Sequence, residues 1–293
     1  MPDREVEFRP AVFARSLRHE LSSRNLRYAE RLGLPKSESR GEPPVVCYRP
    51  SENGRVHGNF LPETYRAILK NDSWRKRLQK VHSAAREALP RTDRRWCELD
   101  SSNSSDALLM NIFCFPRTPR HQGVFNMLGV EQPASPQFGF RARVPFGNRQ
   151  ADRTEVDMRI GNLLVEAKLT EPGFQSASIA TVHSYRDFHE VFDCAMLPRA
   201  KNCYFSYQLI RNVLAAYAHH CSFCVMIDAR RPDLLAAWYG VMRAIVLLEL
   251  RLRCKGITWQ ELARQLPRRL QEFLEEKYGI VTAGSSSPVC SNI

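Results

Sequence analysis

The chain has 293 residues, which is enough for one large domain or two modest ones. Hydrophobic residues make up 43% and charged residues 25%, an ordinary globular composition. The N-terminal MPDREVEF holds no apolar segment of the kind that a signal peptide needs, and the most apolar run, near residue 245, is interrupted by charges well short of a membrane span. We therefore expect a cytoplasmic protein that does not enter a membrane.

Basic residues outnumber acidic ones by 43 to 31, which gives a net charge of +12. The excess is concentrated in residues 71–95, which hold eight basic and three acidic side chains. A field of this sign attracts polyanions such as phosphate backbones. A solvated helix face explains the same segment equally well.

The predicted elements begin with a largely helical stretch over residues 1–95, interrupted by a segment rich in Pro, Gly and Ser. A helix over 104–115 follows, because apolar residues recur at helical spacing after Ser and Asn residues suited to a cap. Three strands come next, over 137–146, 154–160 and 163–169.

The second half begins with an irregular stretch over 172–200. Helical periodicity then predicts a helix over 203–219, and the compact apolar run over 222–228 predicts a strand. Two helices end the chain, over 232–252 and 258–277, the latter opened by Thr258 and Glu261 as a capping box. From residue 104 the predicted order is helix, three strands, helix, strand.

The chain contains nine cysteines, which are too dispersed to predict a disulfide framework. One CxxC pair, Cys221 and Cys224, would be half of a metal site that Cys194 and Cys203 could complete. Because no second CxxC follows and the pair borders a buried strand, we expect reduced core cysteines. A cysteine–metal interaction protein is kept as an alternative.

Residues 154–171, TEVDMRIGNLLVEAKLTE, predict a hairpin whose two-residue loop, Gly161 and Asn162, suits a primed turn. Counting outward from this loop places Asp157 opposite Glu166 and Glu155 opposite Lys168. Because side chains alternate between the faces of a strand, one face carries only apolar residues: Val156, Met158, Ile160, Leu163, Val165, Ala167 and Leu169.

The other face of the hairpin carries Glu155, Asp157, Glu166 and Lys168. Like charges directly opposed across two strands are destabilising, and a hard divalent cation such as Mg²⁺ would turn this repulsion into coordination. The alternative is a solvated face on which Glu155 pairs with Lys168. The apolar residues around Glu166 favour a buried strand, where charges are rare without partners, so we predict a metal site.

Asp157 followed after a hairpin by Glu166-Ala167-Lys168 resembles the PD-(D/E)XK restriction-endonuclease-like nuclease superfamily, in particular its uncharacterised bacterial members. No Pro precedes Asp157, where the name-giving motif has one. The resemblance implies an α/β fold with a restriction-endonuclease-like core of helix, three strands, helix and strand, flanked by helical N- and C-terminal extensions. We predict a basic helical extension over 1–95, a nuclease-like domain with C-terminal helices over 96–280, and a disordered tail over 281–293.

By this resemblance the chain is a metal-dependent nuclease that hydrolyses phosphodiester bonds, expected to be a DNA endonuclease of bacterial restriction or repair. Asp157 and Glu166 would bind Mg²⁺ or Mn²⁺, and the backbone carbonyl of Ala167 would add a ligand. Lys168 would orient the attacking water and neutralise the transition state.

Many members of the superfamily carry a further acid in the first helix, and we expect Glu98 in that role as a third metal ligand. Asp106 is instead explained by the helix dipole. Gln208 and Arg211 lie three residues apart on one helical face. Gln208 resembles a catalytic glutamine that some members place beside the metal, and a surface hydrogen-bond pair with Arg211 explains it equally well.

Four arginines interleaved with phenylalanines predict a phosphate-contacting rim next to the site: Arg141, Arg143, Arg149 and Arg153. The expected partner is nucleic acid, DNA in the first place, and a homodimer is compatible with the sequence. A catalytically silent nucleic-acid-binding module on the same fold is the nearest alternative. It predicts a broken acid–lysine set, whereas the set is intact here.

Overall fold

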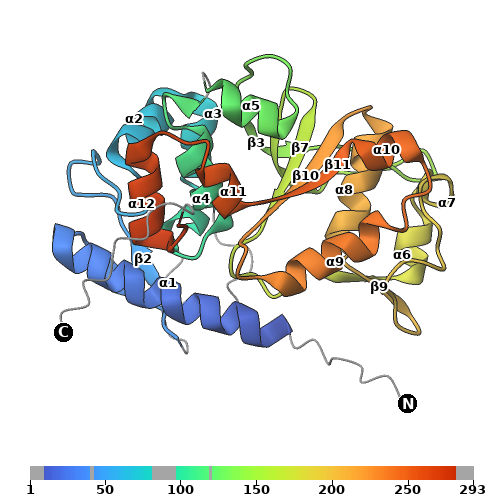
Figure 1. Cartoon of the computed structure of the whole chain (residues 1–293), viewed down its shortest axis with the longest axis horizontal. Coiled ribbons are helices and arrows are strands. Elements are labelled where there is room, and N and C mark those ends of the chain that lie inside the picture. The colour runs from blue at the N-terminus through green and yellow to red at the C-terminus, as the bar shows by residue number, and fades with distance from the viewer. Residues whose placement is uncertain (1–9, 40–42, 81–96, 119–120, 282–293) are drawn as a thin grey trace, which may run out of the picture.

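The central sheet, seen in Figure 1, has the strand order β11–β10–β7–β6–β3. The computed structural model describes residues 10–39, 43–80, 97–118 and 121–281, and five strands of these residues form the sheet. Strands β3, β6 and β7 are antiparallel neighbours, whereas β7, β10 and β11 run parallel. Their bounds are β3 (Gln137–Arg141), β6 (Glu155–Ile160), β7 (Leu163–Ala167), β10 (Ser222–Ile227) and β11 (Cys254–Thr258).

Helices cover both faces of the sheet (Figure 1), and each face has its own apolar core. The side chains of β7 alternate between these two cores. Leu163 and Val165 pack in one, which we call the first core, and Leu164 packs in the other, the second core. Helices that pack in the first core are α1 (Pro10–Leu32), α4 (Ser105–Phe113), α5 (Gln122–Leu128), α11 (Trp259–Ala263) and α12 (Arg268–Tyr278). Helices of the second core are α6 (Ile179–His183), α7 (Phe188–Val191), α8 (Tyr207–Ala218), α9 (Pro232–Met242) and α10 (Leu248–Leu252).

A smaller apolar cluster joins the N-terminal segment to α4, with Tyr65 and Ile68 packing against Ala107 and Met110. Helix α2 (Pro62–Lys70) contributes to this cluster, and α3 (Asp72–Arg77) follows it directly. The remaining short elements are β1 (Lys36–Glu38), β2 (Val46–Tyr48), the 3₁₀ helix η1 (Glu98–Asp100), β4 (Val144–Pro145), β5 (Ala151–Asp152), β8 (Ser176–Ser178) and β9 (Cys203–Phe205).

The succession α4, β3, β6, β7, α8, β10 contains the predicted order of helix, three strands, helix and strand. Short elements are inserted into it: α5 before β3, the pair β4 and β5 before β6, and the group from β8 to β9 before α8. The N-cap of α4 is Ser104, whose side chain accepts a hydrogen bond from the backbone of Ala107. This confirms the helix predicted from residue 104.

Three of the predicted elements are divided in the structure. The predicted strand over 137–146 becomes β3 and β4, separated at Arg143, which has a positive φ of 51°. The first residues of the predicted helix over 203–219 form β9, and α8 begins only after Ser206, which has a positive φ of 59°. The predicted helix over 232–252 becomes α9 and α10, with Ile245 bridged to Phe192 between them.

The last predicted helix, over 258–277, is also two helices. Pro267 lies at the N-cap of α12 and separates it from α11, because proline cannot supply the backbone donor that a helix interior requires. The capping box of Thr258 and Glu261 at the start of α11 is confirmed. Strand β11, which pairs with β10 immediately before this cap, was not predicted.

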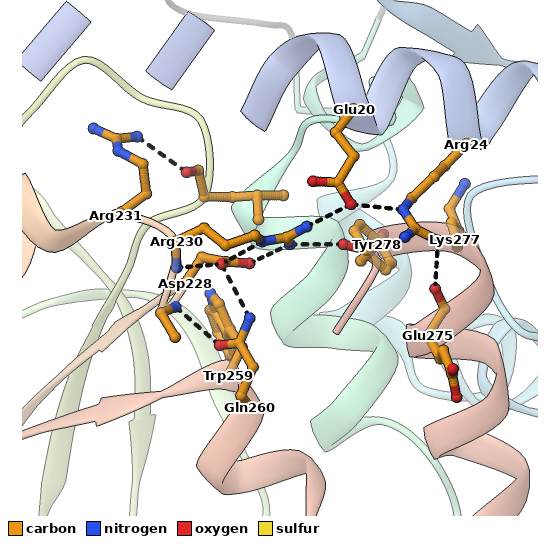
Figure 2. Close-up of polar contacts among 12 residues, drawn as sticks. Glu20, Arg24, Asp228, Arg230, Arg231, Trp259, Gln260, Glu275, Lys277 and Tyr278 are labelled. Atoms are coloured by element: carbon orange, nitrogen blue, oxygen red, sulfur yellow. Dashed lines mark hydrogen bonds and ion pairs between the residues drawn. The ribbon is translucent and has the colours of Figure 1, made fainter. Parts of the chain in front are cut away.

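Helix α1 is tied to the C-terminal part of the chain by an ion-pair network (Figure 2). Glu20 of α1 lies 2.8 Å from both Arg24 and Arg230, and Arg230 also pairs with Asp228 at the carboxyl end of β10. Arg230 donates a further hydrogen bond to the carbonyl of Tyr278 in α12. The first helix of the predicted extension is therefore linked through Arg230 to the end of β10, and Arg24 bonds it directly to the carbonyl of Glu275 in α12.

The same helix also shares the first core, where Leu17, Leu21 and Tyr28 pack in one cluster with Phe273 and Leu274. The predicted tail over 281–293 lies, except for residue 281, outside the described residues. None of the helices in the described parts combines the length and apolar character that a membrane span requires.

Candidate functional site

The hairpin of β6 and β7 has the predicted turn and, near it, the predicted register. Gly161 has a positive φ of 56°, as the first residue of a primed turn requires. Ile160 pairs with Leu163 and Met158 with Val165. The described pairing of the two strands ends there, one position before Asp157 and Glu166.

Beyond this last pair the side chain of Asp157 bridges the two strands. Its Oδ2 accepts a hydrogen bond from the backbone N–H of Ala167 at 2.7 Å. The pKa of Asp157 is well above its usual range, because burial penalises its charge and the carboxylates of Glu166 and Asp106 repel it. Lys168 opposes this shift. Asp157 therefore lies within electrostatic reach of Glu166, Lys168 and Asp106.

Glu166 and Lys168 form a buried ion pair at the end of β7. Their side chains are only 2% and 8% exposed, and Lys168 Nζ lies 2.7 Å from Glu166 Oε1. Although burial alone lowers the pKa of Lys168, the charges of Glu166 and Asp157 outweigh it and raise that pKa above its usual value. Lys168 is therefore a cation throughout the neutral range. The solvated polar face that was the alternative to a buried site is excluded for these two residues.

The backbone of Lys168 is held on both sides. Its N–H donates to the carbonyl of Met226 in β10 at 2.8 Å, and its carbonyl accepts from the indole Nε1 of Trp259 at 2.9 Å. Its ammonium group lies 5.6 Å from the ring centroid of Phe174, within cation–π distance. Trp259 begins α11 directly after the unpredicted strand β11, so its contact with the site was not predicted either.

Helix α8 supplies the second partner of Glu166. Asn212 is fully buried and donates from Nδ2 to Glu166 Oε2 at 2.7 Å. Arg211 donates from Nε and Nη2 to Asn212 Oδ1, and from Nη2 to the carbonyl of Glu155. Because Arg211 takes up the amide oxygen, the amide nitrogen of Asn212 is left for Glu166. The sequence contained a signal for Asn212, which lies four residues after Gln208 and so on the same helical face.

Gln208 and Arg211 do not form the surface pair that was the alternative to a catalytic glutamine. Arg211 is 3% exposed and bonds to Asn212 and to the backbone of β6. The backbone N–H of Gln208 donates to the carbonyl of Phe174. Among the described residues, its buried side-chain oxygen Oε1 has no hydrogen-bond donor.

Glu155 does not face Lys168 as predicted. It lies 3.1 Å from Arg77, 3.6 Å from Lys80 and 3.8 Å from Arg141. The predicted position of Val156 is also wrong, since it packs in the second core whereas Met158 packs in the first. Both differences arise because β6 separates from β7 beyond Met158, so that counting from the turn no longer describes its first half.

The two candidate acids before the sheet have different surroundings. Asp106, in the first turn of α4, is 6% exposed, bonds to Arg77 at 2.6 Å and acts electrostatically on Asp157. Glu98, in η1, pairs with Lys80 at 2.9 Å. Of these two acids, Asp106 is therefore the one whose charge raises the pKa of Asp157, although its position had been attributed to the helix dipole.

The four arginines of the predicted rim are all exposed, and they border the entry to β6. Arg141 ends β3 and lies 3.8 Å from Glu155. Arg143 and Arg149 flank β4 and both have a positive φ, of 51° and 66°. Arg153 lies between β5 and β6. The exposed cations thus follow one another along the segment that leads to Asp157.

The CxxC pair does not form half of a metal site. Cys221 packs in the second core and Cys224 in the first, on opposite sides of β10. Burial raises the pKa of both thiols, that of Cys224 to about 12, which keeps them protonated. In residues 10–39, 43–80, 97–118 and 121–281, no group of three or more His, Cys, Asp or Glu side chains is arranged to hold a metal ion.

Comparison with known proteins identifies a family for the chain. The matching family model is described as restriction endonuclease associating with ARP, and it covers residues 15–279. No curated protein and no solved structure matches the chain. The family match includes most of α1, the hairpin, α8 and the C-terminal helices, and therefore the whole of the site described above. The chain thus belongs to the family of restriction endonucleases associating with ARP.

Proposed function

We propose that the protein is a metal-dependent endonuclease of the PD-(D/E)XK type, which hydrolyses phosphodiester bonds of nucleic acid, DNA in the first place. The observation that carries this proposal is the buried Glu166–Lys168 pair beside Asp157, on neighbouring strands of the central sheet. A buried lysine and two interacting carboxylates are a costly arrangement for a fold that needs only stability. The family match supports the same class of activity.

The donor groups of the site fit Mg²⁺ or Mn²⁺. Mg²⁺ is usually held by one or two carboxylates, with waters and substrate phosphates as the other ligands. Asp157 and Glu166 supply two such carboxylates, and their mutual repulsion, which raises the pKa of Asp157, is what a divalent cation would relieve. The carbonyl of Ala167 would add a ligand. When bound, the metal supplies an activated water and stabilises charge on the phosphate.

The surrounding side chains prepare this site for hydrolysis. Lys168 is a fixed cation that would orient the attacking water and offset the charge that develops on the phosphate. Asn212, itself fixed by Arg211, holds the second oxygen of Glu166 in place. Gln208, whose buried Oε1 has no donor among the described residues, would accept a hydrogen bond from a water molecule or from substrate when the site is occupied.

The test is a cleavage panel of labelled duplex DNA, single-stranded DNA, branched DNA and RNA, each incubated with Mg²⁺, Mn²⁺ or EDTA. We expect cleavage of at least one DNA substrate with either metal and none with EDTA. Binding of nucleic acid by folded protein without cleavage of any substrate would contradict the enzyme and favour the silent binding module. Elemental analysis for zinc and iron on the same preparation tests the cysteine–metal alternative.

The exposed rim should contribute salt-sensitive affinity for nucleic acid. Replacing its four arginines with Gln should make the slope of log affinity against log salt shallower by up to about 0.9 per arginine removed. Its members are Arg141, Arg143, Arg149 and Arg153. The matched control replaces four exposed arginines on the C-terminal helices and should leave the slope unchanged: Arg243, Arg264, Arg268 and Arg269. Equal slopes for both variants would assign the rim to ordinary surface.

The other basic segment, residues 71–95, is described only up to residue 80. Within the described part, Arg77 and Lys80 are paired with carboxylates. Arg75 and Lys76 are exposed, and the other four basic residues of the segment lie outside the described ranges. The predicted contribution to salt-sensitive affinity therefore falls on Arg75, Lys76 and those four residues.

A further inference from the structure

Two cations of the N-terminal segment lie among the acids that border Asp157. Arg77, the last residue of α3, bonds to Asp106 from Nη2 at 2.6 Å and to Glu155 from Nη1 at 3.1 Å. Lys80 lies 2.9 Å from Glu98, 3.6 Å from Glu155 and 3.8 Å from Asp106. The two basic side chains therefore bridge η1, α4 and β6.

The fold is shaped to admit the guanidinium group. The Arg77 side chain is only 11% exposed. Gly139 of β3 has a positive φ of 65°, and a Cβ at this position would lie 2.3 Å from Arg77 Nη1 and 2.9 Å from Glu155 Oε2. Any other residue would collide with the ion pair or strain the backbone. The close approach of Arg77 to the sheet therefore depends on this glycine.

Helix α3 is anchored where it presents Arg77. The indole Nε1 of Trp74 donates to the carbonyl of Pro136 at 3.0 Å, and the Trp74 ring meets Phe138 edge to face, with ring centroids 6.3 Å apart. The N-cap Asn71 accepts hydrogen bonds from two backbone N–H groups of the first turn. Arg77 is thus held by its own helix as well as by its carboxylate partners.

The acids around Asp157 fall into two groups with different counter-charges. Asp157 and Glu166 share one cation, Lys168. The second group has three acids, Asp106, Glu155 and Glu98. Their partly buried counter-charges are Arg77 and Lys80, and the exposed Arg141 lies 3.8 Å from Glu155. The two groups adjoin, because Asp106 acts on Asp157 and Glu155 lies two residues before it on β6. In two-metal nucleases such neighbouring carboxylates hold a second ion about 4 Å from the first.

On the basis of the metal-dependent function proposed above, we propose that Arg77 and Lys80 occupy the place of a second divalent cation, so that the site takes a single Mg²⁺ or Mn²⁺. The carboxylates that border Asp157 are already paired with these fixed basic side chains. The segment that carries Arg77 and Lys80 thereby completes the charge balance of a site whose other residues come from the sheet, η1, α4 and α8.

The test counts Mn²⁺ bound to the full-length chain, from the paramagnetic resonance signal of free Mn²⁺ during titration. The wild type should bind one ion, and Asp157→Asn should bind none. The variant Arg77→Gln/Lys80→Gln should bind a second ion, because Asp106 and Glu98 lose their cations and Glu155 keeps only the exposed Arg141. Arg77→Lys keeps the charge and should retain the wild-type stoichiometry.

The matched control is Arg75→Gln/Lys76→Gln, which changes the charge of the same helix by the same amount at two exposed positions. It should bind one ion. If Arg77→Gln/Lys80→Gln does not fold, Arg77→Gln/Asp106→Asn removes one charge of each sign from the buried pair. This variant should fold and bind one ion.

Two results would overturn the proposal. One is a wild type that binds two ions and loses the second in Asp106→Asn. In that case a metal ion would displace Arg77 from Asp106. The other is a folded Arg77→Gln/Lys80→Gln variant that binds no second ion. A failure of the proposed function looks different, because the ion would then be absent from the wild type or retained by Asp157→Asn.

Discussion

Asp157→Asn is expected to leave the metal-free protein as stable as the wild type or more stable at neutral pH, while cleavage falls by a factor on the order of a thousand. The loss of rate follows from the loss of a metal ligand, worth several kcal/mol at about 1.4 kcal/mol per tenfold. The gain in stability follows from the removal of a charge that Glu166 and Asp106 repel. The amide oxygen of Asn can still accept the hydrogen bond from Ala167.

The pH dependence of this gain has a definite sign. Because the pKa of Asp157 is raised by folding, its protonated form stabilises the fold at low pH, and that stabilisation is lost as the pH rises through the raised value. Asn mimics the protonated form at every pH. The variant should therefore match the wild type below about pH 4, the ordinary pKa of aspartate, and exceed it at neutral pH by up to about 1 kcal/mol, the scale of one cross-strand pair.

Urea denaturation in EDTA at a series of pH values measures this difference, and melts with Mg²⁺ show whether metal still stabilises the variant. The control is Asp72→Asn, which alters an exposed acid in a surface pair with Arg75 and should change stability by only a few tenths of a kcal/mol. Cleavage by Asp157→Asn at the wild-type rate would show that the metal-nuclease proposal is wrong.

The part of the site that could be predicted from the sequence is the part formed by neighbouring residues. A two-residue loop and alternating side chains were sufficient to predict the pairs Ile160–Leu163 and Met158–Val165. The same alternation indicated that Glu166 and Lys168 share a face, and the apolar residues around them indicated burial. These inferences require only the geometry of one hairpin, in which local rules hold.

The contacts that were missed join segments far apart in the chain. Arg77 precedes its partner Glu155 by 78 residues, and Asn212 follows Glu166 by 46. No local pattern shows which carboxylate a distant arginine or asparagine will meet. The register counted from the turn is also wrong for the first half of β6. Beyond the last described pair with β7, Val156 packs in the second core and not in the first.

Strand β11 shows why some elements could not be predicted either. Its sequence, CKGIT, contains a lysine and a glycine and lacks the strict alternation of a half-buried strand. It becomes a strand because it pairs with the buried β10 and because Trp238 packs closely over Gly256. The predicted helices ended at residue 252 and began again at Thr258, which caps α11, so the other four residues of β11 fell between them without an assignment.

Lys168→Met is expected to reduce cleavage as strongly as Asp157→Asn but to change stability in the opposite direction. The change leaves Glu166, whose side chain is 2% exposed, without its cation. Breaking a buried pair by removing one partner typically destabilises a fold by about 3–5 kcal/mol. Because the pKa of Lys168 lies above its usual value, its charge is present across the neutral range, and this loss should not vary with pH there.

A double-mutant cycle separates the charge of the pair from its packing. Glu166→Gln/Lys168→Met removes both charges and should recover most of the lost stability without recovering cleavage. The control Lys255→Met alters a lysine of the same sheet whose Nζ bonds to the carbonyl of Leu128 and, within the described part of the chain, to no carboxylate, so it should keep the wild-type rate.

Opposite shifts in stability with the same loss of activity can be explained only by the charges of the site. General damage to the fold would lower the stability of both single variants, whereas charge repulsion at Asp157 and charge compensation at Lys168 predict a gain for one and a loss for the other. Mg²⁺ should stabilise Lys168→Met more than the wild type, since the metal replaces the missing cation beside Glu166, and should not stabilise Asp157→Asn. A Lys168→Met protein that cleaves at the wild-type rate would remove the lysine from the reaction, and one that melts above the wild type would contradict the ion pair.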